Sequence, residues 1–248
     1  GFAYELFLDE KGEKISKSKG NGITIDQWLE YASPESLSLY MYQNPKRAKK
    51  LYPDVVPKAV DEYLNLIDKF FQQKPNEQIL NPVWHIHNGS PPKEKIVMPF
   101  SMLLNIVGSS NAKTKEVLWK FIKKFHKEID PKTHKIFDGL TKYAINYFLD
   151  EVEPKKKFKK PNDTERKALE QLVINLKKIP QDKPAEEIQT IIYTIGKDNG
   201  YSKNLRDWFM LIYEVIFGEK NGPRMGFFIS FFGVKETIDL LDKKLKMR

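Results

Sequence analysis

Apolar residues recur every three or four positions over most of the chain, which is the spacing of helices that bury one face. This spacing begins after Ser33, which is suited to cap a helix that opens at Pro34, and it appears again after Pro57. Further helical segments are predicted at 100–107, 115–125, 134–152, 164–178, 185–197, 205–217, 227–232 and 234–245. The pattern therefore predicts a mainly α fold.

Three stretches depart from the helical spacing. Residues 4–8 alternate as a strand does, and because the chain opens on Gly1 without a signal-peptide pattern, we expect it to be an excised piece of a longer protein. Residues 74–98 are rich in proline, which predicts an extended connection with at most a short ordered segment around 83–86. Residues 154–161 place five lysines between two prolines, which predicts an exposed basic linker between two helical units.

The composition adds a charge that the helices do not explain. The chain carries 42 Lys and Arg against 33 Asp and Glu, a formal charge of +9, which favours a polyanionic partner. Cysteine is absent, so disulfides and thiolate metal sites are excluded, and we expect a cytoplasmic protein. The apolar run at 227–234 is far shorter than the roughly 20 residues of a bilayer span, so we expect no membrane partner.

Residues 14–22 carry the clearest chemistry. Lysines at 14, 17 and 19 alternate with serines, and Gly-Asn-Gly closes the segment at 20–22. The ammonium groups, hydroxyls and backbone amides of such a loop can wrap a polyphosphate. An ammonium group beside a departing pyrophosphate stabilises the negative charge that builds up there during the reaction. For an arbitrary loop of this composition, the alternative is a solvated basic turn.

The segment Lys14-Ile15-Ser16-Lys17-Ser18 closely resembles the Lys-Met-Ser-Lys-Ser signature of class I aminoacyl-tRNA synthetases, with Ile15 in place of Met. Isoleucine keeps the bulk and apolarity of methionine, and swaps that hold volume usually cost less than ~1.5 kcal/mol. The surrounding sequence is similar to the class I lysyl-tRNA synthetase family over nearly the whole chain, at 32–37, 41–42, 45–49, 54–57, 60–63, 109–112 and 222–224.

This resemblance implies an enzyme that attaches lysine to its tRNA with ATP. Lys14 and Lys17 would grip the ATP phosphates while the adenylate forms, and Ser16 and Ser18 would shape the loop. ATP with Mg²⁺ is then a substrate of the intact enzyme, and we expect this chain to bind no cofactor tightly. In the family a nucleotide-binding domain precedes the loop. We therefore expect no adenylate formation by this chain alone, and lysine and ATP as partners only together with that missing half.

The resemblance also implies how the chain is divided. Residues 1–25 would end an α/β catalytic domain, 26–153 would form a helical stem or connecting domain, 154–161 a linker, and 162–248 a helical anticodon-binding domain. The partner would be lysine tRNA, whose anticodon bases are read in a single-stranded loop by stacking and hydrogen bonds.

Arginines and aromatic residues are the ones to seek for reading bases. The candidates are Arg224 first, then Arg206, Trp208 and Tyr201, with Lys46, Arg47, Lys49, Lys50 and the lysines of 155–160 as phosphate contacts. Other roles remain open: Arg224 could cap a helix, Trp208 could lie in the core, and the lysines could be solvated. We expect the phenylalanines at helical spacing to be core residues, namely Phe227, Phe228, Phe231 and Phe232.

The sequence around His85 and His87 superficially resembles the His-Ile-Gly-His signature of the same enzymes. It follows the lysine loop and lacks the glycine, so we reject it as an ATP site. The four histidines are expected to be hydrogen-bonded structural residues, with no metal site. Two other functions remain open, a free-standing basic helical RNA-binding module and a helical scaffold for an acidic protein partner. DNA is not expected as a partner.

Overall fold

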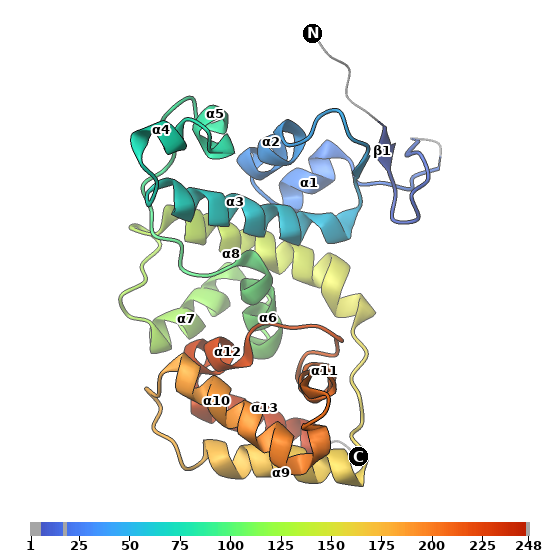
Figure 1. Ribbon diagram of the computed structural model, residues 1–248, viewed down its shortest axis with the longest axis vertical. Helices are drawn as coiled ribbons and strands as arrows, with labels where there is room; N and C mark the ends of the chain where they lie inside the picture. The colour runs from blue at the N-terminus through green and yellow to red at the C-terminus, as the bar shows by residue number, and fades with distance from the viewer. Residues whose placement is uncertain (1–5, 17–18, 247–248) are drawn as a thin grey trace. The chain divides into compact units, whose positions relative to one another are not determined.

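The computed structural model describes residues 6–16 and 19–246 and is mainly helical there (Figure 1), as predicted. No helix in these residues is long and apolar enough to cross a membrane. The α-helices are α1 (Ile25–Tyr31), α2 (Pro34–Tyr42), α3 (Val56–Phe70), α4 (Pro75–Gln78), α5 (Pro82–Ile86), α6 (Phe100–Ser110), α7 (Lys115–Phe125), α8 (Lys135–Tyr147), α9 (Asp163–Leu176), α10 (Ala185–Gly196), α11 (Leu205–Ile216), α12 (Met225–Phe232) and α13 (Val234–Lys246).

The chain separates into two compact units. Unit 1 holds Gly1–Leu103 and Ile129–Glu151, and unit 2 holds Leu104–Glu128 and Val152–Arg248. Each unit is therefore built from two stretches of sequence. The four-part division expected from the family resemblance stays a prediction about domains.

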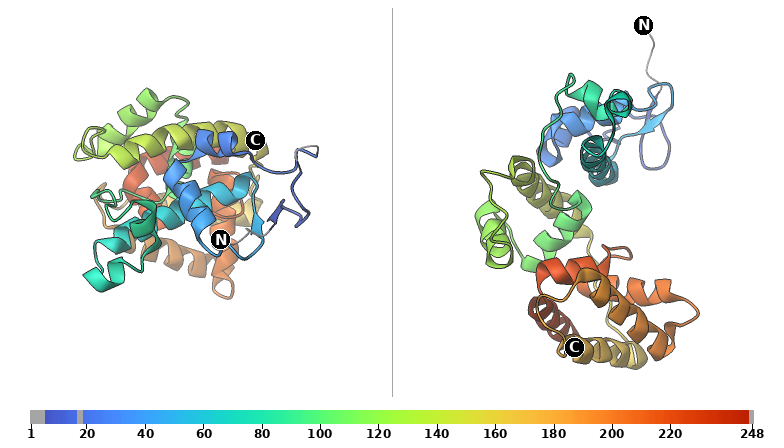
Figure 2. Two further views of the ribbon diagram at one scale, coloured as in Figure 1. Left: turned by 90° about the horizontal axis from the view of Figure 1, so that it is seen from above. Right: turned by 60° about the vertical axis from the view of Figure 1, so that its left-hand side comes forward.

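Unit 1 contains a short parallel pair of strands, β1 (Phe7–Leu8) and β2 (Lys49–Lys50). Phe7 pairs with Lys49 and Leu8 with Lys50. The strand predicted at 4–8 is thus present at its C-terminal end, and residues 4 and 5 lie outside the described part. Figures 1 and 2 show β1 and the segment after it at the edge of unit 1, beyond α1 and α2.

Helix α2 of unit 1 begins where its capping residue predicts. The Ser36 amide donates to Ser33 Oγ at 3.3 Å, which confirms Ser33 as the N-cap of α2. In α3 the predicted apolar stripe is buried, except that the side chain of Phe71, just after the helix, is 41 % exposed. The rings of Tyr31 on α1 and Tyr147 on α8 meet edge to face at 5.4 Å between centroids, which joins the two ends of the unit's sequence.

The proline-rich stretch at 74–98 is more ordered than predicted. It forms α5 at the predicted ordered segment, and also α4, before it becomes extended. In the extended part, the carboxylate of Glu94 accepts hydrogen bonds from the backbone amides of Ile136 at 2.9 Å and Phe137 at 3.2 Å. A carboxylate at a helix N-terminus satisfies amides that have no partner within the helix. The stretch is therefore fastened to the start of α8.

Aromatic side chains form much of the core of unit 2. Phe228 packs edge to face on Phe217 at 4.9 Å and stacks on Phe232 at 5.1 Å, and Phe232 stacks on Phe121 of α7 at 5.1 Å. Phe228 and Phe232 are buried, as predicted. Helix α12 approaches α10 at Gly226, whose amide donates to Gln189 Oε1 at 2.7 Å. These contacts bring sequence from 104–128 and from the last hundred residues into one core.

The segment predicted as a basic linker is fixed to unit 2 through its backbone. The Lys157 amide donates to the Gly218 carbonyl at 3.0 Å, and the Lys159 amide donates to the Glu214 carbonyl at 3.1 Å. Most of its side chains are exposed, as expected, but its backbone runs along the end of α11.

Candidate functional site

The lysine-rich loop begins in a tight hairpin. Leu8 and Lys14 form an antiparallel bridge, and the Ile15 amide donates to the Phe7 carbonyl at 2.9 Å. Gly12 turns the chain with φ +85°, in the left-handed region that favours glycine. The hairpin places Lys14 at the start of the loop with its side chain exposed to solvent.

Asn21 ties the two ends of the loop together. Its Oδ1 accepts from the Ser16 amide at 3.1 Å, while its Nδ2 donates to Asp9 Oδ2 at 2.7 Å and to the Lys14 carbonyl at 3.4 Å. The hydrogen bond from Asn21, aided by backbone amides, holds the pKa of Asp9 below its usual value. The predicted site residues include neither Asn21 nor Asp9, and the glycines on either side of Asn21 were the only sequence signal.

The predicted phosphate-gripping residues fall partly within the described chain. Lys14 is exposed, and Ser16 is half-buried with its Oγ accepting from the Lys19 amide at 3.2 Å. Lys17 and Ser18 lie outside the described residues. The roles assigned to these four residues therefore stay predictions.

The side chain of Ile15 packs against the end of the loop, and that of Lys19 adds a positive charge to it. Ile15, at the Met position of the signature, packs over Gly22, where an added Cβ would lie 2.6 Å from its Cδ1. The Lys19 ammonium group lies 3.5 Å from the Glu13 carboxylate, and both side chains are mostly exposed. Exposed ion pairs contribute little free energy, so an incoming anion can displace Glu13.

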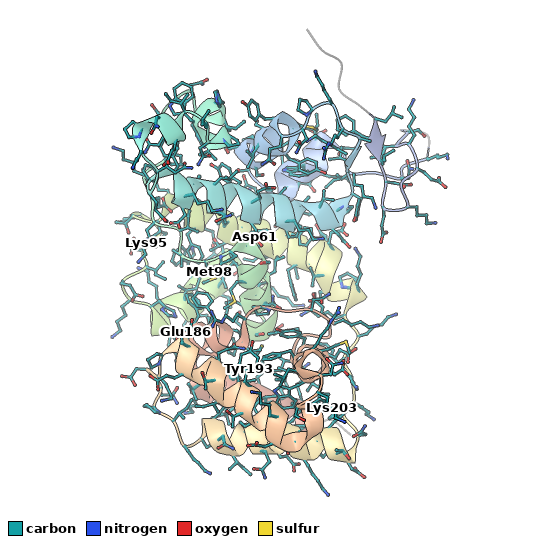
Figure 3. All side chains as sticks on the ribbon, in the orientation of Figure 1. Asp61, Lys95, Met98, Glu186, Tyr193 and Lys203 are labelled. Atoms are coloured by element: carbon teal, nitrogen blue, oxygen red, sulfur yellow. The ribbon has the colours of Figure 1, made fainter. Side chains whose placement is uncertain are left out.

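In unit 2, Arg224 extends from a turn that neighbouring helices hold in place. The Tyr213 hydroxyl donates to the Pro223 carbonyl at 3.0 Å, and Gly222 lies so close to the Tyr213 ring that any side chain would collide. The Arg224 guanidinium forms an ion pair with Glu186, which Figure 3 shows at the start of α10. The side chain makes no capping hydrogen bond at the start of α12, so Arg224 does not act as a side-chain helix cap.

Trp208 cannot stack on a base in this structure, which corrects its prediction as an RNA contact. Its side chain is fully buried, and its Nε1 donates to the Ile192 carbonyl at 2.9 Å. The ring lies against Gly196, where a side chain would collide with it. Tyr201 is half-buried with its ring 5.3 Å from that of Trp208, whereas Arg206 is exposed.

Phe227 was expected in the core, but it is 38 % exposed. Tyr193, which was not among the predicted contacts, is 41 % exposed, and its ring meets that of Phe209 edge to face at 5.1 Å. Figure 3 shows Tyr193 farther along α10 from Glu186. One signal was present: the buried α10 stripe of Ile188, Ile192 and Ile195 leaves Tyr193 off its line. The two aromatic residues add base-stacking candidates in unit 2.

Lys49 was predicted to contact phosphate, but in this structure its ammonium group is engaged within the protein. Its ammonium group donates to the carbonyls of Tyr40 and Gln43 at the end of α2 and lies over the Tyr40 ring. Burial lowers the pKa of Lys49, as expected for a cation that leaves water. Lys46 and Arg47 are exposed and remain candidates.

The lysines near the start of α9 differ in their surroundings. Lys159 pairs with Glu165 at 2.7 Å, and this hydrogen bond raises the pKa of Lys159. The ammonium groups of Lys156 and Lys244 lie 5.9 Å and 3.2 Å from the centroid of the Phe158 ring. Lys157 and Lys160 are exposed and remain candidates for phosphate contacts.

All four histidines are hydrogen bonded, as predicted. His85 bonds to the Ile79 carbonyl, His126 to the Phe231 carbonyl and His134 to the Asp130 carbonyl, while His87 Nε2 lies 3.0 Å from the Tyr63 hydroxyl. His87 and Tyr63 border a cavity of about 410 Å³ in unit 1. Within residues 6–16 and 19–246, no three His, Asp or Glu side chains gather as a metal site would require.

Comparison with known proteins shows similarity to lysine-tRNA ligases. Residues 1–90 match a family described as tRNA synthetases class I (K). The chain is 47 % identical over 244 residues to a lysine-tRNA ligase of Roseobacter denitrificans, covering 98 % of this chain and 46 % of the relative. It is 44 % identical over 247 residues to one of Rickettsia felis, covering 99 % and 47 %. The chain spans about half the length of these relatives, and along that span it is related to the lysine-tRNA ligases.

Proposed function

We propose that this chain is the tRNA-reading part of a cytoplasmic class I lysine-tRNA ligase and carries the loop that holds the phosphates of ATP. The observation that carries the proposal is similarity to lysine-tRNA ligases over 98 % of the chain, together with the family match that includes residues 14–22. Because the chain spans about half of those relatives, we propose that it does not form the adenylate alone.

In the intact ligase, Lys14 and Lys17 hold the phosphates of ATP while the lysine carboxylate attacks. Their ammonium groups stabilise the charge that develops on the departing pyrophosphate. Mg²⁺ enters with ATP, bound to its phosphates. Changing Lys17 to Ala should reduce lysine-dependent pyrophosphate exchange by about 10²–10³, the usual cost of losing one such donor. A turnover equal to that of the wild type would contradict this role.

The helical unit 2 binds the anticodon of lysine tRNA. Arg224 supplies hydrogen bonds, and the exposed rings of Tyr193 and Phe227 offer faces on which unstacked bases can lie. The turn at 222–224 is held by Tyr213, so the arginine starts from a rigid backbone. Arg206 and Tyr201 are weaker candidates for reading bases. Lys46 and Arg47, in unit 1, add phosphate contacts that position the RNA without reading it.

Binding by the isolated chain tests this proposal. Fluorescence anisotropy should detect binding of lysine tRNA, and weaker binding of the same tRNA with its anticodon exchanged. A basic helical RNA-binding module of another kind would bind both tRNAs equally. A scaffold for acidic proteins would bind any polyanion as well as tRNA at matched salt. Measurable pyrophosphate exchange by the isolated chain with lysine and ATP would contradict the proposed division of labour.

A further inference from the structure

We infer that Asn21, acting with Asp9, is a positioning residue for the adenylation step. It joins residues 14–16, where the lysine loop begins, to residues 21–22, where the loop ends. We call this junction the neck of the loop, and the loop carries the lysines that are proposed to hold the ATP phosphates. The inference rests on the proposed function, because the loop acts on ATP only if the chain is part of a ligase. An amide is neither an acid nor a nucleophile, so its contribution must come through geometry.

The observations place Asn21 across the neck of the loop. Ser16 and Lys14 lie on the segment that enters the loop, and Asn21 lies on the segment that leaves it. The three hydrogen bonds of the Asn21 side chain join these segments to each other and to Asp9. Packing of Ile15 over Gly22 closes the neck on its apolar side. Lys14 is therefore bonded, through its own carbonyl, to the residue that sets the spacing of the neck.

The neck requires a carboxamide in particular. The side chain accepts from the Ser16 amide and donates to a carboxylate and a carbonyl, and among small side chains only an amide does both with two atoms. The other oxygen of Asp9 accepts from the Glu13 amide at 2.8 Å, so Asp9 is held facing Asn21. Because a displacement of about 1 Å from the reacting groups can cost about 10²-fold in rate, loosening the neck should slow the reaction.

The first experiment measures lysine-dependent pyrophosphate exchange by the full-length ligase that contains this chain. Asn21→Ala should lower kcat/KM for ATP by about 10- to 100-fold, the usual effect of losing hydrogen bonds to a charged group. The KM for lysine should not change. Asn65→Ala, an exposed asparagine on α3, is the matched control and should behave as the wild type.

Exchanging the two side chains separates positioning from a general loss of structure. Asn21→Asp sets two carboxylates against each other and should lower exchange more than Asn21→Ala does. This loss should diminish as the pH falls and the pair takes up a proton. The double variant Asp9→Asn with Asn21→Asp restores one donor between the two side chains. Its pyrophosphate exchange should be at least tenfold faster than that of Asn21→Asp.

A structural measurement on the isolated chain completes the test. Nuclear magnetic resonance titration of the Asp9 carboxyl group should show its pKa rising toward the usual value in Asn21→Ala, and an unchanged pKa would overturn the inference. Wild-type activity within twofold in Asn21→Ala, or a double variant no better than Asn21→Asp, would overturn it as well. A wild-type ligase without lysine-dependent exchange would instead remove the proposed function, and the inference with it.

Discussion

At the scale of single residues, the surroundings of a cation decide what it can bind. Arg224 and Glu186 form an ion pair with 58 % and 71 % of their side chains exposed. Lys49, by contrast, gives its hydrogen bonds to two helix carbonyls. A pair that remains in water is worth at most about 1 kcal/mol, so a ligand can replace one partner at little cost. Arg224 is thus free to exchange Glu186 for RNA, whereas Lys49 would first have to leave α2.

Replacing Arg224 by Ala should weaken binding of lysine tRNA by about 1–3 kcal/mol, roughly 5- to 150-fold, because an arginine that contacts a base contributes that much. Titration of tRNA into the isolated chain measures the change. Glu186→Ala is the matched control: it removes the same ion pair but leaves the arginine, and binding should be unchanged or tighter. Equal losses in both variants would mean that the ion pair itself matters, and not a contact to RNA.

Lys244 gives the chain a pH-dependent stability. Burial first, then repulsion from Lys156 and Lys243, lowers the pKa of Lys244 from 10.5 to about 8. Between pH 8 and 10.5 the unfolded chain binds more protons than the folded one, so this residue makes stability rise with pH. Below pH 8 the ammonium group is charged in both states, and the folded state carries the full penalty.

Lys244→Met should therefore raise the Tm at pH 7, and its advantage over the wild type should shrink as the pH rises to 10. Thermal unfolding of the two proteins at pH 7, 8, 9 and 10 gives the comparison. Lys246→Met, which changes an exposed lysine two residues away on the same helix, should show a constant difference. A constant difference for Lys244→Met as well would show that its pKa is not depressed.

At the scale of elements, two helices can approach closely where one of them carries a glycine, which has no side chain, at the contact. Gly226 lets α12 approach α10, where a side chain would collide with the Ala185 carbonyl and with Gln189. Arg224 lies two positions before this contact and Glu186 one position after Ala185. The packing of the two helices therefore determines where Arg224 stands relative to α10.

Gly226→Ala should destabilise the chain by about 1–3 kcal/mol, because extra volume in a packed contact strains its neighbours. Gly139→Ala on α8 is the control, since nothing lies within 4 Å of an added Cβ there. Alanine is the better helix former by about 0.5–1 kcal/mol, so the control should be stabilised. Urea unfolding followed by circular dichroism measures both, and a neutral Gly226→Ala would contradict the packing described.

At the scale of the whole molecule, which carries a charge of +9, the number of phosphates that its cationic side chains contact sets how binding responds to salt. Each phosphate contact adds about 0.7 to 0.9 to the slope of log Kd against log salt concentration. Changing Lys46 and Arg47 together to Ala should lower this slope by about 1.4 to 1.8 while the preference for the lysine anticodon stays the same. Binding isotherms at 50 to 200 mM salt provide the test. An unchanged slope would show that these two side chains do not touch the RNA.

Much of the fold could be predicted because its cause is local. The segment 115–125 coincides with α7, and Ser33 caps α2, since helical spacing and capping depend on residues close in sequence. Helix α5 lies where a short ordered segment was predicted, but α4 was not foreseen, because proline opens it where an extended chain was expected. The roles predicted for the loop lysines come from a motif, and they remain predictions until activity is measured.

Sequence by itself determined the helical character, the basic charge and the cationic composition of the lysine loop, since these depend on residue type and local spacing. Tertiary structure alone decided which side chains reach solvent. It buried Trp208 against Gly196, engaged Lys49 at the end of α2 and left Tyr193 and Phe227 exposed. It also set Asn21 against Asp9, 12 positions away. The reason is physical: exposure and hydrogen bonding depend on neighbours that folding brings from elsewhere in the chain.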